Sequence, residues 1–168
     1  MISTLLLLLA VGAPTCTTSD LRLESLIAAK AAELGGAEHC QFRLYDNLSD
    51  LDGDRLSDLV VVFTVEQGLR GEKDVQFMGV FLSKTPTESQ VVEVGRTREA
   101  LIVRVDVWPP DIALQAMEYR PEDALCCPTL SGGRTYQLSG DRLQLKSKWR
   151  NSQFRAEPPE VPAQEPRH

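Results

Sequence analysis

The sequence predicts an α+β domain that is mainly β: an N-terminal helix packed on an antiparallel meander sheet of about seven or eight strands. After position 40, short runs rich in Val, Leu and aromatic residues alternate with clusters of Gly, Pro and Asp, a pattern typical of hairpin-connected strands. A segment with helical spacing of apolar residues precedes them. With 168 residues and 42% hydrophobic content, the chain is long enough for one domain with a proper core.

The first residues have the pattern of a secretory signal. The apolar run from Leu5 to Gly12 is far shorter than the roughly 20 residues of a membrane-spanning helix. No charged residue occurs before Asp20, so the α-amino group alone supplies the positive charge of the signal. We expect residues 1–15 to be a signal peptide and the protein to be exported to the periplasm, or held at the cell envelope by a lipid.

Cys16 is the candidate for that lipid. It follows the apolar run and precedes a polar segment, which is where a bacterial lipoprotein carries its acylated cysteine. The residues before it, Ala13-Pro14-Thr15, do not match the usual lipoprotein signal, so ordinary cleavage near Gly12 or Ala13 is the alternative. Lipidation of Cys16 would tether the domain to a membrane face.

A helix is expected from a cap at Thr18 or Ser19 to about Leu34. Its apolar residues recur near the helical period, and Gly35-Gly36 ends it; the apolar positions are Leu23, Leu26, Ile27, Ala31 and Leu34. Residues 16–150 then form one β-rich domain. Strands are expected at 41–45, 58–66, 75–83, 90–94, 100–108, 112–119, 134–138 and 142–148.

Local patterns define the later strands. In the 100–108 strand, alternation predicts that one face carries four apolar side chains, those of Leu101, Val103, Val105 and Val107. Arg104 and Asp106 are then expected to face water. Pro109-Pro110-Asp111 and Ser139-Gly140-Asp141 predict hairpin turns. Residues 151–168 are rich in Pro and Glu, and we expect a disordered tail.

An acidic loop precedes the 58–66 strand and predicts a calcium site. Counting Asp50 as position one, carboxylates fall at positions one, three, five and nine, with the main-chain carbonyl of Leu56 at seven; they belong to Asp50, Asp52, Asp54 and Asp58. Oxygen ligands at alternate positions of a loop can converge on one Ca²⁺ ion, and a glycine between them allows the tight turn that this requires. The twelfth position is Val61 rather than the Glu of an EF-hand, and an apolar strand follows, so the loop is not an EF-hand.

Electrostatics favour a cation over a plain acidic turn. Carboxylates about 5 Å apart repel by roughly 1–3 kcal/mol per pair, and a turn needs only one or two of these residues. Calcium is therefore the expected cofactor. Magnesium fits less well because it prefers a tighter octahedral shell with more waters.

Four cysteines in an exported chain predict disulfides. If Cys16 is acylated, the expected bridge joins Cys40 to Cys126 or Cys127, and a bond between the adjacent Cys126 and Cys127 is an alternative. Zinc or copper held by His39 and these cysteines is a further alternative, although their spacing matches no zinc signature.

The segment from Asp50 to Leu59 resembles the calcium loops of the FG-GAP and VCBS type, with Arg55 where a Gly often stands. More widely, the Tyr45–Leu143 region, with its Asp-x-x-Cys-Cys-Pro element at Asp123–Pro128, resembles small bacterial exported proteins, often lipoproteins, whose function is unassigned. That resemblance implies a place in the cell envelope and a weak association with lysozyme-inhibitor-like domains.

No catalytic group emerges from the sequence. Only His39 and His168 are histidines, so no nucleophile and base can be paired, and Glu118 with Asp123 is a weak acid-base candidate. A net charge of -6 excludes an electrostatic nucleic-acid footprint. We expect a calcium-stabilised binding or structural module that is not an enzyme, with an unknown envelope protein or ligand as partner. The alternatives are a calcium-dependent or metal-assisted hydrolase and an inhibitor of an envelope enzyme such as a lysozyme.

Overall fold

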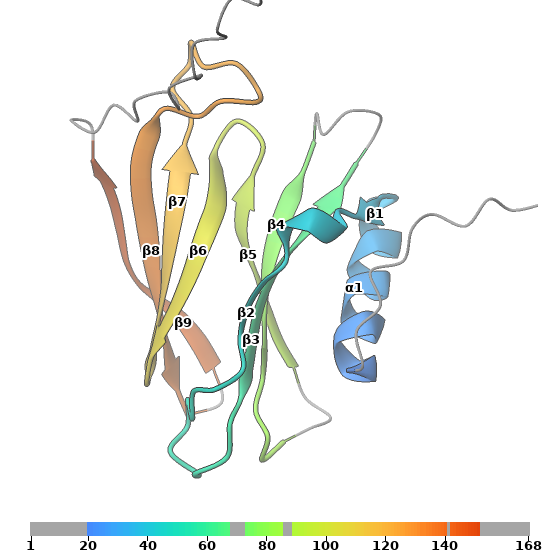
Figure 1. The fold of residues 1–168 in the computed structure, drawn as a ribbon, viewed down its shortest axis with the longest axis vertical. Helices are drawn as coiled ribbons and strands as arrows, with labels where there is room; N and C mark the ends of the chain where they lie inside the picture. The colour runs from blue at the N-terminus through green and yellow to red at the C-terminus, as the bar shows by residue number, and fades with distance from the viewer. Residues whose placement is uncertain (1–19, 68–72, 86–88, 141, 152–168) are drawn as a thin grey trace, which may run out of the picture.

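The computed structural model describes residues 20–67, 73–85, 89–140 and 142–151. Within them the chain forms the helix α1 (Leu21–Leu34), the short 3-10 helix η1 (Cys40–Phe42) and a nine-stranded antiparallel sheet (Figure 1). The strands are β1 (Ala37–Glu38), β2 (Leu44–Asp46), β3 (Leu59–Glu66), β4 (Val75–Phe81), β5 (Ser89–Arg96), β6 (Ala100–Trp108), β7 (Asp111–Glu118), β8 (Leu130–Ser139) and β9 (Arg142–Asn151). The expected fold class is confirmed. The expected signal peptide, Cys16 and the tail beyond residue 151 lie outside the described residues.

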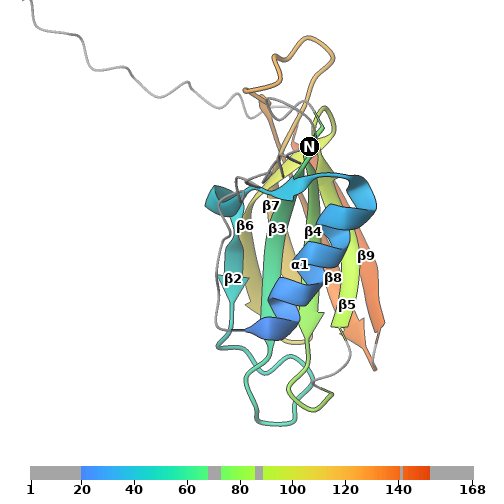
Figure 2. The same ribbon diagram turned by 90° about the vertical axis from the view of Figure 1, so that its right-hand side faces the viewer.

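The sheet is a meander that bends in its middle. Neighbouring strands follow chain order from β3 to β9, while β1 and β2 both pair with β3. β5 pairs with β6 at a single position, Arg96 with Ala100, whereas β6 and β7 pair along their whole length. The halves of the sheet therefore separate after this junction, and in Figures 1 and 2 they lie as two layers.

The main core fills the space between these layers. Side chains from β3, β4 and β5 meet side chains from β6, β7 and β8; the buried members include Val60, Val62, Met78, Val80, Val94, Ile102, Ile112, Leu114 and Leu138. Because successive strand residues point to opposite faces, Val60 and Val62 of β3 belong to this core. The residues between them point the other way, toward the helix.

α1 covers the outer face of β3 and β4 (Figure 2). Leu23 and Ile27 are buried there in a second cluster with Phe63 and Phe77. The helix begins after Asp20, whose carboxylate accepts hydrogen bonds from the main-chain N–H groups of residues 22 and 23. The cap predicted at Thr18 or Ser19 is therefore wrong, because the side chain that satisfies the free amides belongs to Asp20. The predicted end at Leu34 is confirmed, with Gly35 in the left-handed conformation.

A β-bulge in β6 changes the predicted faces of that strand. The pairing register with β7 shifts between Ile102 and Arg104, so one extra residue is inserted. Ala100 and Ile102 face the core before the bulge, and Val105 and Val107 pack against it afterwards. The prediction that Leu101 and Val103 share a face with Val105 and Val107 is wrong for this reason, and Val103 is 51% exposed. Arg104 points to water as expected.

At Ile102 of β6, where β5 no longer pairs with β6, the side chain of a buried glutamine takes the place of a neighbouring strand. Gln76, only 3% exposed, accepts a hydrogen bond from the Ile102 N–H at 2.5 Å and donates one to the Ile102 carbonyl at 3.2 Å. The side-chain amide thus pairs with both main-chain groups of Ile102, as a neighbouring strand would. This contact joins β4 to β6 where β5 no longer pairs with β6.

Two further details differ from expectation. The segment expected as a strand at 41–45 begins as η1 and becomes strand only at Leu44, and β1 was not predicted. Across the part of the chain that the structure describes, no helix has the length and hydrophobicity to cross a membrane.

Candidate functional site

The acidic loop connects β2 to β3 and lies at the lower end of the sheet in Figure 1. The Asp50 carboxylate organises it. Its Oδ1 accepts hydrogen bonds from the N–H groups of Gly53 at 2.7 Å and Asp54 at 3.0 Å, and its Oδ2 accepts one from Arg55 at 2.8 Å. Gly53 and Arg55 both have left-handed φ angles, of 82° and 72°. The chain can therefore curl around one carboxylate.

Asp58 fixes the loop to the body of the protein. It stands directly before β3 and is only 2% exposed. Its Oδ2 accepts a hydrogen bond from the Leu51 N–H at 2.8 Å, and its Oδ1 accepts one from the Ser83 N–H at 2.8 Å. Leu51 is itself buried in the main core. The loop thus has one apolar anchor and one buried carboxylate that bonds to two separate segments.

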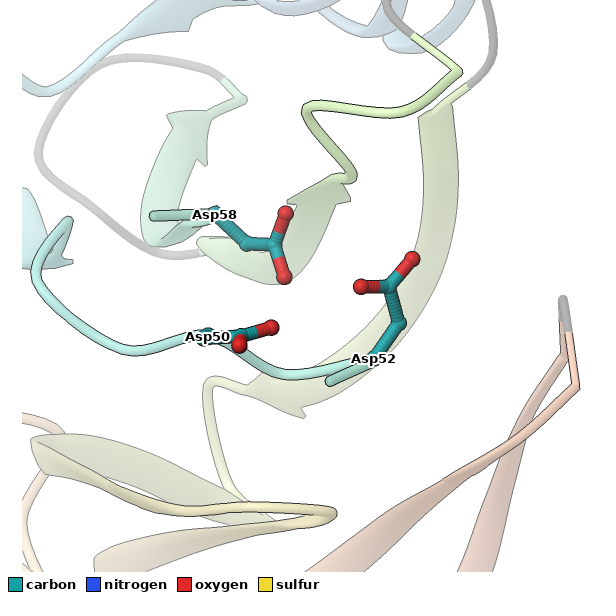
Figure 3. A group of neighbouring side chains, drawn as sticks. All are labelled: Asp50, Asp52 and Asp58. Carbon is teal, nitrogen blue, oxygen red and sulfur yellow. The ribbon is translucent and has the colours of Figure 1, made fainter. Parts of the chain in front are cut away.

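Three of the predicted ligand residues come together here. Asp50, Asp52 and Asp58 each offer a carboxylate oxygen, and these oxygens all lie within 4.8 Å of one another (Figure 3). Oxygens on opposite sides of a Ca²⁺ ion are about 5 Å apart, since each lies 2.3–2.6 Å from the metal. The spacing of the carboxylates is therefore compatible with one shared ion, and the cluster could hold a metal.

Asp54 is not part of this group. Its Oδ1 accepts a hydrogen bond from the Leu56 N–H at 2.7 Å, while its own N–H donates to Asp52 Oδ1 at 3.1 Å. In this arrangement Asp54 shapes the turn rather than adding a ligand to the cluster. The role of the Leu56 carbonyl stays a prediction.

The cysteines pair differently from the prediction. Cys126 is bonded to Cys127, and Cys40 is also disulfide-bonded, so the partner of Cys40 is neither of them. The expected bridge from Cys40 to this pair is therefore wrong. The two adjacent cysteines lie in a turn, in which the Cys127 N–H donates to the Ala124 carbonyl at 3.0 Å, and their sulfurs bond to each other, which leaves neither of them for Cys40. Because these sulfurs are in disulfides, they are not thiolate ligands for the zinc or copper alternative.

The β7–β8 loop that holds this disulfide is fixed by polar contacts. The Tyr119 hydroxyl donates to the Leu125 carbonyl at 2.6 Å. The Asp123 carboxylate accepts hydrogen bonds from the N–H groups of Arg120 and Thr129, at 2.8 and 2.9 Å, and these bonds lower its pKa. The acidic residue of the Asp-x-x-Cys-Cys-Pro element therefore closes the base of the loop.

Sequence reasoning missed a cavity at the opposite end of the sheet. It encloses about 700 Å³ and is lined from η1, β2, β3, β4, β6 and the β7–β8 loop, by His39, Gln41, Phe42, Leu44, Thr64, Glu66, Asp74, Gln76, Leu101, Ile102, Val103, Leu125 and Cys126. One signal was present in the sequence. Glu66 ends one strand and Asp74 precedes the next, so antiparallel pairing brings two carboxylates to the same end of the sheet.

The two carboxylates named as acid-base candidates both have partners in the fold. Glu118 is 1% exposed and forms an ion pair with Arg150 through Oε2, while its buried Oε1 has no hydrogen-bond partner among the described residues. The Asp123 carboxylate accepts hydrogen bonds within its own loop.

The fold and the cluster define a mainly β domain with an acidic loop able to hold a metal ion. Comparison of the chain with protein-family models, curated proteins and solved structures finds no match.

Proposed function

We propose that the protein is an exported, calcium-stabilised binding or structural module of the bacterial cell envelope, without catalytic activity. The observation that carries the calcium part is the convergence of Asp50, Asp52 and Asp58 within 4.8 Å at the entrance to a buried strand. Three carboxylates at this spacing repel one another, and a divalent cation among them would convert that repulsion into attraction.

The chemistry of the cluster favours calcium. All three side chains offer hard oxygen ligands, with no imidazole or thiolate among them. Ca²⁺ accepts irregular oxygen shells that include main-chain carbonyls and water, which suits a loop whose carboxylates also accept hydrogen bonds from the main chain. Residues of the loop would hold the ion through Asp50, Asp52 and Asp58, and the ion would supply cross-linking rather than a reaction.

The position of Asp58 supports a stabilising role. This buried carboxylate already bonds to Leu51 in the loop and to Ser83 beyond β4. An ion shared by Asp58 and Asp50 would therefore link the acidic loop to the start of β3 and, through Asp58, to the segment after β4. Calcium would thus act on the free energy of unfolding of the whole domain.

Export is supported by two features. The apolar start of the chain has the pattern of a secretory signal. The disulfide between Cys126 and Cys127 and the bonded state of Cys40 are typical of an oxidising compartment.

Thermal unfolding tests the calcium part directly. In a saturating excess of calcium, about 100 times the dissociation constant, linkage gives about 2.7 kcal/mol of extra stability, or a rise in Tm of roughly 5–10 °C relative to chelator. The variant Asp50→Asn should lose this difference. Asp106→Asn, at a surface ion pair on β6, is the matched control and should keep it. An equal Tm in calcium and in chelator for the wild type would contradict the proposal.

A further inference from the structure

The cavity at the end opposite the acidic loop has a divided lining. One part is apolar and includes Phe42, Leu44, Leu101 and Leu125. Gln76 also lines the cavity, but its side-chain amide is committed to Ile102. Leu101 and Val103 flank the core residue Ile102, so they point away from the core and line this cavity. A volume of about 700 Å³ is in the range of small-molecule sites.

The polar part of the lining is acidic. It contains Glu66, Asp74 and His39, and among the described residues that line the cavity none is Lys or Arg. Asp74 is held in place through its main chain, since its N–H donates to Thr97 Oγ1 at 2.9 Å and its carbonyl accepts from the Thr97 N–H at 2.9 Å. Its carboxylate is therefore presented by a fixed backbone.

Two buried atoms of this part have no partner among the described residues. They are Asp74 Oδ1 and His39 Nδ1. Buried polar atoms nearly always have a hydrogen-bond partner, so each such atom at a cavity wall calls for a partner beyond the described residues. The His39 ring is itself held edge-on against Phe42, with centroids 4.6 Å apart.

The electrostatic surroundings of the Asp74 carboxylate suit a positively charged partner. Burial raises the pKa of its carboxyl above the ordinary value, and the negative charge of Glu66 raises it further, whereas His39 lowers it. A positive group placed beside Asp74 would remove this repulsion.

We propose that this cavity binds a small organic cation, an ammonium group attached to an apolar body. The ammonium group pairs with the Asp74 carboxylate at the acidic part of the lining, which also contains His39 and Glu66. The apolar body lies against Leu44, Leu101 and Phe42. A bare metal ion fits less well, because His39, Glu66 and Asp74 do not gather at ligand distances; within the described ranges only the Asp50 cluster does so.

This inference gives a ligand class to the binding part of the proposed function, but it does not depend on calcium. The two sites lie at opposite ends of the sheet, since the acidic loop precedes β3 and Glu66 ends it. Each can therefore be tested with the other disabled.

Calorimetric titration with two matched probes tests the proposal. The probes are 4-phenylbutylammonium and neutral 4-phenylbutanol, which share the apolar body and differ in the head group. The full chain should bind the cation about tenfold or more tightly than the alcohol, because hydrogen bonds to a charged partner are the stronger ones. The same preference should persist in chelator, which separates this result from the calcium claim.

Three variants locate the binding. Asp74→Asn keeps the shape of the side chain and should abolish the preference for the cation. Val103→Arg, at a half-exposed position of the lining, should weaken cation binding without touching the core. Asp106→Asn lies outside the lining and should leave the preference unchanged. Equal affinity for the two probes, no binding of either at millimolar concentration, or a preference that survives Asp74→Asn would overturn the proposal.

Discussion

Asp58 Oδ1 accepts a hydrogen bond from the Ser83 N–H at 2.8 Å, although the two residues are 25 positions apart. The other oxygen of the same carboxylate accepts the Leu51 N–H. One buried side chain thus connects the loop before β3 with the segment after β4. The acidic cluster is therefore part of the framework of the fold as well as a candidate ion site.

Replacing Asp58 by Ala should destabilise the domain markedly. The change leaves the buried N–H groups of Leu51 and Ser83 without an acceptor, and one such loss costs about 1–3 kcal/mol. We expect a loss of about 2 kcal/mol or more in the free energy of unfolding, measured by urea denaturation in chelator. Glu99→Ala, at an exposed carboxylate, is the control and should change little. A loss below about 0.5 kcal/mol for Asp58→Ala would contradict this structural role.

Arg55→Gly should stabilise the protein. Arg55 has a φ of 72°, in the left-handed region that costs a non-glycine residue about 1–2 kcal/mol. Part of this gain is lost to the greater flexibility of Gly in the unfolded chain, so we expect a net gain of about 0.5–1 kcal/mol. Arg55→Ala removes the same charge but keeps a Cβ atom, and it should give no gain. If both variants behave alike in denaturant unfolding, backbone conformation is not the cause.

Gly132→Ala should destabilise the protein through Glu118. A Cβ atom at position 132 would lie 2.9 Å from the Glu118 carboxyl, which is buried and paired with Arg150 across this glycine. We expect a cost of about 1–3 kcal/mol, typical of overpacking. In a Glu118→Ala background the same substitution should cost much less. Equal costs in both backgrounds, measured as a double-mutant cycle, would exclude this contact as the reason.

Asp74→Asn should make the protein more stable at neutral pH. Burial, with the charge of Glu66, raises the pKa of the folded carboxyl above the 3.8 of an unperturbed Asp; His39 acts in the opposite direction, and Tyr119 also lies close enough to be influenced by Asp74. The folded state therefore holds this proton more tightly than the unfolded state does. The wild type loses stability as pH rises through the folded pKa, whereas Asn does not titrate.

The difference in unfolding free energy between Asp74→Asn and wild type, followed from pH 3 to 8, checks this sign. It should favour the variant at pH 7 and shrink as the pH falls below the unperturbed value. Asp106→Asn, at a half-buried carboxylate paired with Arg104, provides the reference for removing a carboxylate away from the cavity. A variant less stable than wild type at pH 7, with the gap closing at low pH, would show that Asp74 is stabilised as an anion by partners in the fold.

Local signals in the sequence were enough to predict the helix and most of the strands. Gly35 ended the helix where expected, and Pro109-Pro110 joined two strands as a hairpin. The ligand spacing of the acidic loop predicted that four Asp carboxylates come together; those of Asp50, Asp52 and Asp58 do, whereas that of Asp54 does not. These features depend on residues close together in the chain.

Long-range features could not be predicted in this way. The bulge in β6 changes which residues of the strand face the core, and the adjacent Ile102 is bonded by Gln76, which lies 26 positions away in the chain. The sequence could not decide between a bridge from Cys40 and the bond between the adjacent Cys126 and Cys127, because that choice depends on whether Cys40 lies close to this loop in the fold. The cavity is lined by residues from six elements that are far apart in the chain, so no local sequence pattern predicts it.

Calcium binding measured by titration calorimetry on the full chain tests the central claim most directly. The account predicts binding of one Ca²⁺ per chain in wild type and in Asp106→Asn, with at least a tenfold loss of affinity in Asp50→Asn and in Asp52→Asn. Magnesium should bind more weakly than calcium. No detectable calcium binding by the wild type, or undiminished affinity in both cluster variants, would contradict the account.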